Sequence, residues 1–496
     1  MTGMAKPKER LNKRNARKTS RPLKGCVKSN AFKRNAKSDT PQLQHLPNED
    51  ILRSILSRLT FRESLRMGLL SHKWRCLWRS CCPKVVLTRA TMLPGHTSVR
   101  RRRTNFVRRV NNFLQQLSPP PTLNKFVVKF GLRRKHTSHV NRWINFCFTS
   151  RAQHVTIDFA PGVKGIRQGL ADSKYIFPLN VFSDPDCSST HIKSLHLGYV
   201  CLNTNTADFV GFTNLKKLTL HKISFFGELQ GLMLPECTAL EWLNISCSSL
   251  PCLTTCQPLQ RLQYLRLHYC NLEKIELEAP NLTSLDLSNR PIPFALGGSL
   301  KVVEANIKLL NTTSPYGDNL DYIYTELPAA LHHVQKLTIT SDLYIFDELQ
   351  RYARTSARFI NLRHLALSLD LYGDDRSVVG ILRLAYLLEL APVLEELELH
   401  VLGDDVTVGR MLRGNMLPYL HDKLKRVLIS GACRWEGLME LAYHILRSAR
   451  RLECMIIDPM MRIEGRPPYG WMVDRGRKMI KKLFEREEFE GILTIL

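Results

Sequence analysis

The chain has 496 residues, of which 44% are hydrophobic and 23% charged, and its formal net charge is +28. This length is too great for one ordinary compact domain, so it indicates either several domains or an array of repeats. The charge is uneven, because residues 1–45 hold thirteen Lys and Arg against only Glu9 and Asp39. The chain contains no run of 18 apolar residues, which argues against a membrane-spanning helix.

Residues 1–42 are rich in Lys, Arg, Asn and Ser and contain few large apolar side chains. Such a segment cannot bury enough apolar surface to offset its chain entropy, so we expect a disordered basic tail. A solvated tail that no receptor reads is one interpretation of its charge. A nuclear-import signal or a nucleic-acid arm is the other, and the candidate residues are Lys6, Lys8, Arg10, Lys13, Arg14, Arg17 and Lys18.

Residues 43–84 change abruptly to a pattern of three short helices. The Asn-Glu-Asp at residues 48–50 suits a helix start, and apolar side chains follow it at helical spacing. The Thr-x-x-Glu at residues 60–63 has the form of a capping box for a second helix, and Ser71 can begin a third. A unit this small rarely folds firmly alone, so part of its apolar surface should be buried on a neighbour or a partner.

The same segment resembles an F-box, whose pattern is a Leu-Pro entry, an Ile-Leu helix and a closing Ser-x-x-Trp-Arg. In this chain it reads LPNEDILRSILSRLTFRESLRMGLLSHKWRCLW, with a minor departure from the family at residues 71–74. The resemblance implies a motif that packs on a Skp-type adaptor, which is joined to cullin and a RING subunit. It also implies which residues form the motif's core and adaptor contact: Leu46, Pro47, Ile51, Leu52, Ile55, Leu56, Leu59, Leu65, Leu70, Trp74 and Trp78.

Residues 85–150 are predicted to link the F-box to the following domain. Within this segment, Phe106, Val110, Phe113 and Leu117 recur at helical spacing after a run of four arginines. This pattern predicts an amphipathic helix that ends at Ser-Pro-Pro-Pro. We expect the helix to pack on the next domain with a solvated basic face, although a basic amphipathic helix can also contact a membrane or an acidic partner.

From residue 151 to residue 496 the template apolar-x-x-apolar-x-apolar recurs twelve times. A short strand directs alternate residues inward, and such units stack because none can bury its apolar face alone. Val155 is the centre of a weaker thirteenth copy. The central positions of the twelve copies are Leu195, Leu218, Leu243, Leu265, Ile275, Leu285, Val303, Leu337, Leu365, Leu397, Val427 and Met455.

The first intervals between these positions, 23, 25 and 22 residues, lie in the range of leucine-rich repeats. The intervals of 10 on either side of Ile275 predict strands joined by brief loops, and the later, longer intervals leave room for helices. Cys270 occupies the position where such repeats place an inward Asn or Cys, so we expect it to be structural. The region resembles the irregular repeats of plant F-box proteins. The predicted fold class is therefore α/β: a small three-helix F-box and an irregular leucine-rich-repeat solenoid with a C-terminal cap, behind a disordered basic tail.

The sequence contains no recognisable catalytic or cofactor-binding motif. It lacks the phosphate-binding loop, the nucleophile elbow and the His-Glu-x-x-His zinc motif. Cys247, Cys252, Cys256 and His268 match no common zinc spacing, and a cysteine in a repeat core is usually a small buried apolar residue. We therefore expect no catalytic residue, no metal and no cofactor.

The resemblance implies a non-catalytic substrate-recognition subunit of a Skp-cullin-F-box ubiquitin ligase. Its F-box would bind the adaptor, and its repeats would bind an unidentified protein target. The alternative is a basic nuclear scaffold that binds protein or nucleic acid outside a ligase, although no stacking platform or DNA-binding motif accompanies the charge. Fourteen cysteines without a CxxC pair fit a reducing compartment, so we expect the nucleus and/or cytoplasm and no membrane partner.

Overall fold

The structure is a computed structural model in which residues 49–496 form one compact unit. It describes residues 49–59, 61–70, 72–81, 84–93, 101–117, 120, 122–160, 174–179, 191–203, 212–226, 231–234, 237–255, 257–297, 301–310, 319–345, 357–373, 383–403, 421–431, 436–459, 474, 477–478, 480–482, 484 and 491–496. The basic tail, the import candidates from Lys6 to Lys18, Leu46 and Pro47 lie outside the described residues. Among the helices that are described, none has the length and apolar character needed to cross a membrane.

The three helices predicted for the F-box are α1 (Glu49–Arg58), α2 (Phe61–Leu70) and α3 (His72–Cys81). Each has ten residues and a pronounced apolar face. Glu49 and Asp50 lie in the first turn of α1, where carboxylates interact favourably with the positive end of the helix dipole. The predicted capping residues of α2 and α3, Thr60 and Ser71, lie outside the described residues.

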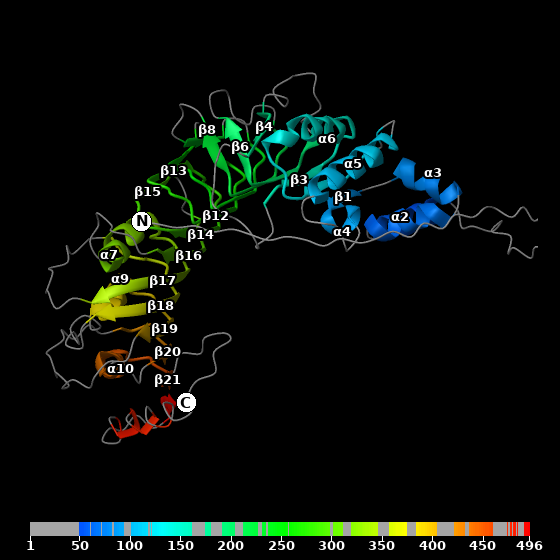
Figure 1. Cartoon of the computed structure of the whole chain (residues 1–496). Helices are drawn as coiled ribbons and strands as arrows, with labels where there is room; N and C mark the ends of the chain where they lie inside the picture. Colours follow the sequence, from blue (N-terminus) through cyan, green and yellow to red (C-terminus); the bar gives the residue numbers. More distant parts are fainter. Residues whose placement is uncertain are drawn as a thin grey trace, which may run out of the picture. The chain divides into compact units, whose positions relative to one another are not determined.

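Fifteen of the described strands form one sheet in which each strand pairs in parallel with the next (Figure 1). Strands that alternate with return segments on one side must all run the same way, which is the arrangement expected of a repeat solenoid. In spatial order the strands are β1 (Lys84–Thr88), β2 (Lys125–Lys129), β3 (His154–Asp158), β5 (Ser194–Gly198), β7 (Lys217–His221), β10 (Trp242–Ser246), β12 (Tyr264–His268), β14 (Ser284–Asn289), β16 (Glu304–Leu309), β17 (Lys336–Ile345), β18 (His364–Gly373), β19 (Glu396–Gly403), β20 (Arg426–Ser430), β21 (Cys454–Asp458) and β22 (Leu493–Ile495).

The return segments cover one face of this sheet, and they differ along the chain (Figure 1). Near the middle they form two small parallel sheets: β4 (Tyr175–Phe177), β6 (Val200–Asn203) and β8 (Ser224–Phe226), then β9 (Gly231–Met233), β11 (Cys252–Thr254), β13 (Lys274–Glu278) and β15 (Phe294–Gly297). Elsewhere they are helices: α4 (Arg89–Met92), α5 (Arg102–Gln115), η3 (Arg134–His136), α6 (Thr137–Thr149), α7 (Asn319–Ala330), η7 (Arg383–Ala385), α9 (Tyr386–Leu390) and α10 (Glu436–Ser448).

The core lies between the sheet and its return segments and is built from in-register columns of apolar side chains. Leu265 of β12 pairs with Leu243 on one side and Leu285 on the other, and all three are almost fully buried. Each strand of the main sheet from β1 to β21 buries two residues of this kind, two positions apart. Because side chains alternate between the faces of a strand, the residues between them form a second, solvent-facing surface, here called the strand face.

Backbone hydrogen bonds fix the register where each strand begins and ends. The carbonyl of Lys216, just before β7, accepts from the amides of both Glu241 and Trp242 at 2.8 and 3.0 Å. Equivalent double acceptors precede the neighbouring strands. Just after β10 and β12, Cys247 and Tyr269 adopt left-handed backbone conformations and donate to the end of the next strand. The same turn therefore recurs along the array.

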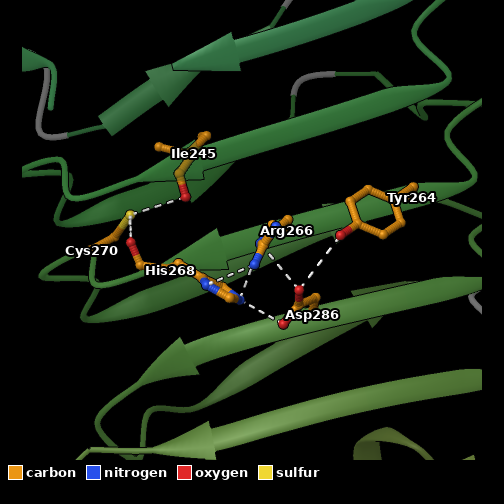
Figure 2. Close-up of polar contacts among 6 residues, drawn as sticks. All are labelled: Ile245, Tyr264, Arg266, His268, Cys270 and Asp286. Atoms are coloured by element: carbon orange, nitrogen blue, oxygen red, sulfur yellow. Dashed lines mark hydrogen bonds and ion pairs between the residues drawn. The ribbon is translucent and has the colours of Figure 1, made fainter. Parts of the chain in front are cut away.

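Cys270 follows one of these turns and is structural, as predicted. Its side chain is 2% exposed, and its thiol donates to the carbonyls of Ile245 and His268 at 3.5 and 3.4 Å (Figure 2). Burial raises the pKa of the Cys270 thiol to about 11, so the thiol stays protonated and inert.

Two of the predicted repeat centres need correction. Ile275 lies in β13, a strand of the return side, so the step from Leu265 to Leu285 is one repeat of 20 residues and not two short ones. The template cannot distinguish a strand of the main sheet from a strand of the return side, because both direct alternate apolar residues into the same core. Val303 is 42% exposed, and the true centre of that repeat is the fully buried Ala305.

The segment 85–150 is also more than a link. Its helix over residues 100–117 is confirmed as α5, which buries Phe106, Val107, Val110 and Leu114. However, β1 and β2 already belong to the main sheet, so the array of strands begins at residue 84. Leu123, Phe126 and Val128 fit the repeat template and are buried, although the prediction did not include them. The predicted domain boundaries themselves remain predictions.

Two glycines offer a matched test of how tightly the turns are packed. Gly431 follows β20 and Gly491 precedes β22, and both have positive φ, 86° and 91°. A Cβ at 431 would overlap the carbonyl oxygen of Val401, whereas a Cβ at 491 would meet nothing within 4 Å. Both alanine variants should lose about 1 kcal/mol through left-handed strain. Gly431→Ala must also displace a backbone carbonyl, so urea denaturation should show a clearly larger loss. An equal or smaller loss than for Gly491→Ala would contradict this close approach.

Candidate functional sites

The apolar residues of the F-box segment divide into an interior set and a surface set. Leu52 and Leu56 of α1 are 1% exposed, and Trp74 and Trp78 of α3 are 7% exposed. These four side chains form the interior of the motif together with Phe61 and Leu77. Removing one of them would damage the fold of the motif first and any contact with a partner only as a consequence.

The surface set consists of Ile51 and Ile55, which lie one helical turn apart on α1. Their side chains are 52% and 39% exposed. Isolated exposed isoleucines are common, but two on one turn of an otherwise amphipathic helix form a continuous apolar strip. Arg53 lies within 3.5 Å of Glu49 and 3.6 Å of Asp50, so charged groups flank the strip at its N-terminal end.

The remaining predicted adaptor residues are placed less completely. Leu59 is half-buried just after α1. Leu65 and Leu70 lie in α2, although their side chains are not among those described. The role of the whole set in adaptor binding stays a prediction.

Aromatic side chains of the F-box pack against an aromatic side chain of α5. Phe113 of α5 contacts Phe61 with ring centroids 5.7 Å apart and Trp78 with centroids 5.9 Å apart. The first pair is edge-to-face, which is a favourable arrangement worth about 0.5–1.5 kcal/mol beyond the burial of the rings. Phe106 of α5 in turn stacks on Phe130, just after β2, with ring centroids 4.1 Å apart. The exposed strip of α1 therefore belongs to the same packed unit as the repeats.

The strand face carries a stacked aromatic pair near its middle. Trp242 of β10 and Tyr264 of β12 are register partners, and their rings stack with centroids 3.5 Å apart. On the other side of Trp242, its register partner Lys217 places its ammonium 4.3 Å from the ring centroid. The indole Nε1 of Trp242 and the Oδ1 of Asn244 are buried without a hydrogen-bond partner among the described residues. This part of the face therefore combines apolar area with unused polar atoms.

A charged cluster lies beside this pair and centres on Asp286 of β14 (Figure 2). One carboxylate oxygen of Asp286 lies 3.1 Å from the Arg266 guanidinium, and the other lies 2.5 Å from Nε2 of His268. The Tyr264 hydroxyl donates to the first of these oxygens at 3.5 Å. Burial and the neighbouring carboxylate raise the pKa of Tyr264, which keeps this donor protonated. The side chains come from adjacent strands in register, so the repeat geometry itself assembles them.

Toward β18–β20 the strand face is a network of paired charges. His364 contacts Glu396 at 3.0 Å, and Glu396 is also paired with Arg426 on the next strand, β20. Such pairs at a solvated surface add little stability, about 0–1 kcal/mol each, but they fix where each sign of charge is presented. The strand face therefore varies along the array from aromatic and cationic to alternating charge.

The apolar template predicts the inward residues of these strands and does not select the strand-face residues. The signal was present in the intervening positions of the template, such as Trp242, Tyr264 and Arg266. Only the alignment of neighbouring strands in the sheet shows that these three residues lie together. Among the residues that the structure describes, no group of three or more His, Cys, Asp or Glu side chains could hold a metal ion.

The sequence of the chain is similar to known plant proteins over most of its length. The model of the At1g61320/AtMIF1 LRR domain matches residues 123–480, and the model of the F-box domain matches residues 43–85. The F-box/LRR-repeat protein At3g03360 of Arabidopsis thaliana is 23% identical over 377 residues, which cover 73% of this chain and 70% of that protein. The F-box/FBD/LRR-repeat protein At1g13570 of the same plant is 24% identical, over 70% of this chain and 72% of that protein.

These matches span both features found in the structure, the three helices α1–α3 and the parallel array of strands. They confirm the predicted resemblance and the predicted fold class. The chain belongs to the At1g61320/AtMIF1 leucine-rich-repeat family and carries an F-box domain in front of its repeats.

Proposed function

We propose that the chain is the substrate-recognition subunit of a Skp-cullin-F-box ubiquitin ligase. In this proposal the F-box docks a Skp-type adaptor, which connects the chain to cullin and a RING subunit, and the repeats bind a protein target. The family membership supports this role in general. The observation that carries the docking step is the exposed strip of Ile51 and Ile55 on α1.

The strip is suited to docking because its residues are not needed inside the motif. Burying each isoleucine on a partner would contribute about 1–2 kcal/mol, since about half of each side chain is already covered. The interior residues Leu52 and Leu56 would hold the helix in place for this contact. The proposal thus assigns adaptor binding to Ile51 and Ile55, and support of the fold to the buried Leu52, Leu56, Trp74 and Trp78.

Target binding is proposed for the strand face. The stacked Trp242 and Tyr264 offer apolar area with little side-chain entropy to lose, and Arg266 and Asp286 offer oriented charge. The chain would accelerate ubiquitin transfer without breaking or forming a bond itself, because holding a target near a loaded ubiquitin carrier raises its effective concentration.

A second candidate function is that of a basic scaffold outside a ligase. The net charge of +28 favours it. In either role we propose the nucleus and/or the cytoplasm as the compartment, because the cluster from Lys6 to Lys18 has the composition of an import signal. No disulfide joins the cysteines whose side chains the structure describes, which suits a reducing compartment.

The docking step can be tested with Ile51→Ala and Ile55→Ala combined in the full chain. We expect the affinity for a purified Skp-type adaptor to fall at least about tenfold, because most of the exposed apolar strip is removed. The measurement is biolayer interferometry or calorimetry with wild type and variant side by side.

The matched control combines Ile360→Ala and Val303→Ala, which remove apolar side chains 48% and 42% exposed on the solenoid. This control should bind the adaptor as wild type does. An unchanged affinity of the α1 variant, or an equal loss in the control, would contradict docking through this strip. A wild type that binds no adaptor at micromolar concentration would end the ligase proposal.

The strand-face cluster should be available for recognition because the fold does not depend on it. We expect Asp286→Asn to lower the free energy of unfolding by about 1 kcal/mol or less, since the amide oxygen of asparagine can still accept hydrogen bonds from Arg266 and Tyr264. The adjacent Leu285→Ala, which empties a position 3% exposed in the core, should lower it by about 2–5 kcal/mol. Chemical denaturation of both variants provides the comparison. Equal losses would show that the cluster serves the fold.

A further inference from the structure

The positive charge of the folded part of the chain is concentrated at its N-terminal end. Residues 64–157 contain 19 Lys and Arg and no Asp or Glu. From residue 158 to the end, 37 Lys and Arg are balanced by 39 Asp and Glu. General solubility does not require such segregation, so the acid-free segment calls for a specific explanation.

Within this segment, α5 and the stretch from η3 into α6 enclose an open cleft of about 400 Å³, here called the α5–α6 cleft. Its charged lining is entirely cationic or titratable: Arg108 from α5, Lys135 and His136 from η3, and His139 and Arg142 from α6. Thr104, Asn111, Asn112 and Gln115 supply further polar groups. Among the described residues, Arg108, Lys135 and Arg142 form no ion pair with a carboxylate.

The floor of the α5–α6 cleft is fixed by a chain of hydrogen bonds. The buried Trp143 donates its indole N–H to Oδ1 of Asn111 at 2.8 Å, which orients that amide. Nδ2 of Asn111 then lies 3.1 Å from Nδ1 of His139, and the Arg142 guanidinium lies 2.5 Å from the same nitrogen. Both neighbours can only donate, so Nδ1 is the acceptor and His139 carries its proton on Nε2. The cleft is thereby lined with oriented donors.

The electrostatic environment agrees with this geometry. Burial lowers the pKa of His136 below its usual value, and the charges of Lys135 and Arg103 lower it further although a backbone hydrogen bond opposes them. Burial and the charge of Arg133 likewise lower the pKa of Arg103. The groups around the cleft thus repel additional positive charge, and a bound anion would relieve this repulsion.

A second cavity of about 440 Å³ adjoins the cleft and has an apolar character. It shares Asn111, Gln115 and Arg142 with the cleft, and its other walls are Leu114, Leu117, Pro120, Trp143 and Phe146. A ligand with a charged end and an apolar body would therefore find both kinds of surface within reach.

We propose that the α5–α6 cleft binds a phosphate ester, with its phosphate held by Arg108, Lys135 and Arg142 and its apolar body in the adjoining cavity. At least three permanent cations line the cleft, so a dianionic phosphate matches them better than a single carboxylate does. A guanidinium group can also donate two parallel hydrogen bonds to two oxygens of one phosphate. The cleft lies on the helical side of the sheet, so its ligand would not compete with a target on the strand face. This inference is independent of the proposed ligase role.

The test is calorimetry of the full chain with phenyl phosphate and inorganic phosphate at physiological salt. We expect phenyl phosphate to bind about tenfold or more tightly than inorganic phosphate, because its ring buries apolar area. Arg108→Gln combined with Arg142→Gln should weaken both probes about tenfold or more, since two charge-assisted contacts are lost. Lys135→Gln alone, at an exposed position, should weaken the binding of both probes to a smaller extent. This single variant provides the test if the double variant does not fold.

The matched control is Lys125→Gln combined with Lys129→Gln, which removes the same charge from exposed positions on β2. This control should bind both probes as wild type does. A phosphotyrosine peptide is the third probe. If the peptide binds more tightly than phenyl phosphate, the natural ligand is a phosphorylated peptide. If it binds equally or more weakly, the natural ligand is a free small molecule.

Three results would overturn the proposal. The first is the absence of binding by wild type. The second is an equal loss of phosphate affinity in the control and cleft variants. The same conclusion would follow if duplex DNA binds and both pairs of substitutions weaken DNA binding alike, because the surface would then bind polyanions diffusely. The third is equal affinity for inorganic and phenyl phosphate, which would remove the adjoining cavity from the site.

Discussion

The structure depends on one repeated backbone interaction, the carbonyl that accepts two successive amides from the next strand. Lys216 makes this contact with Glu241 and Trp242, and equivalent carbonyls recur before the neighbouring strands. Two hydrogen bonds to one acceptor favour a single register, because a shift by one residue would move at least one of the two amides away from the carbonyl. A one-residue slip would also turn every apolar side chain from the core to solvent. Register and core therefore support each other along the array.

This register also explains how much of the fold the sequence could predict. The alternation of apolar residues is sufficient to locate most of the strands, since each strand of the main sheet from β1 to β21 buries two residues two positions apart. It failed at Ile275 because a strand on the return side faces the same core. It failed at Val303 because the true centre of that repeat is Ala305, whose small side chain gives a weak apolar signal. Pattern alone contains no information about which side of the core a strand covers.

The candidate sites were predictable to different degrees for physical reasons. The F-box pattern identifies the apolar residues of α1 but cannot separate Ile51 and Ile55 from Leu52 and Leu56. These four residues form one broad apolar stripe, and only packing shows which part of the stripe the chain itself covers. The strand face was out of reach, because its residues become neighbours only through the register of distant segments. The cationic cleft required in addition the placement of α5 against α6.

The register has a further consequence for how this family of chains can diversify. Each strand is aligned only by its two neighbours, so the length of the segment between strands is free to change. The step from Val85 to Phe126 uses 41 residues, and the step from Leu265 to Leu285 uses 20, yet both pairs meet in register. Insertions and deletions in the return segments therefore leave the ladder intact. New loops, helices and clefts can be gained or lost on one side of the sheet while the arrangement of the strand face on the other side is unchanged.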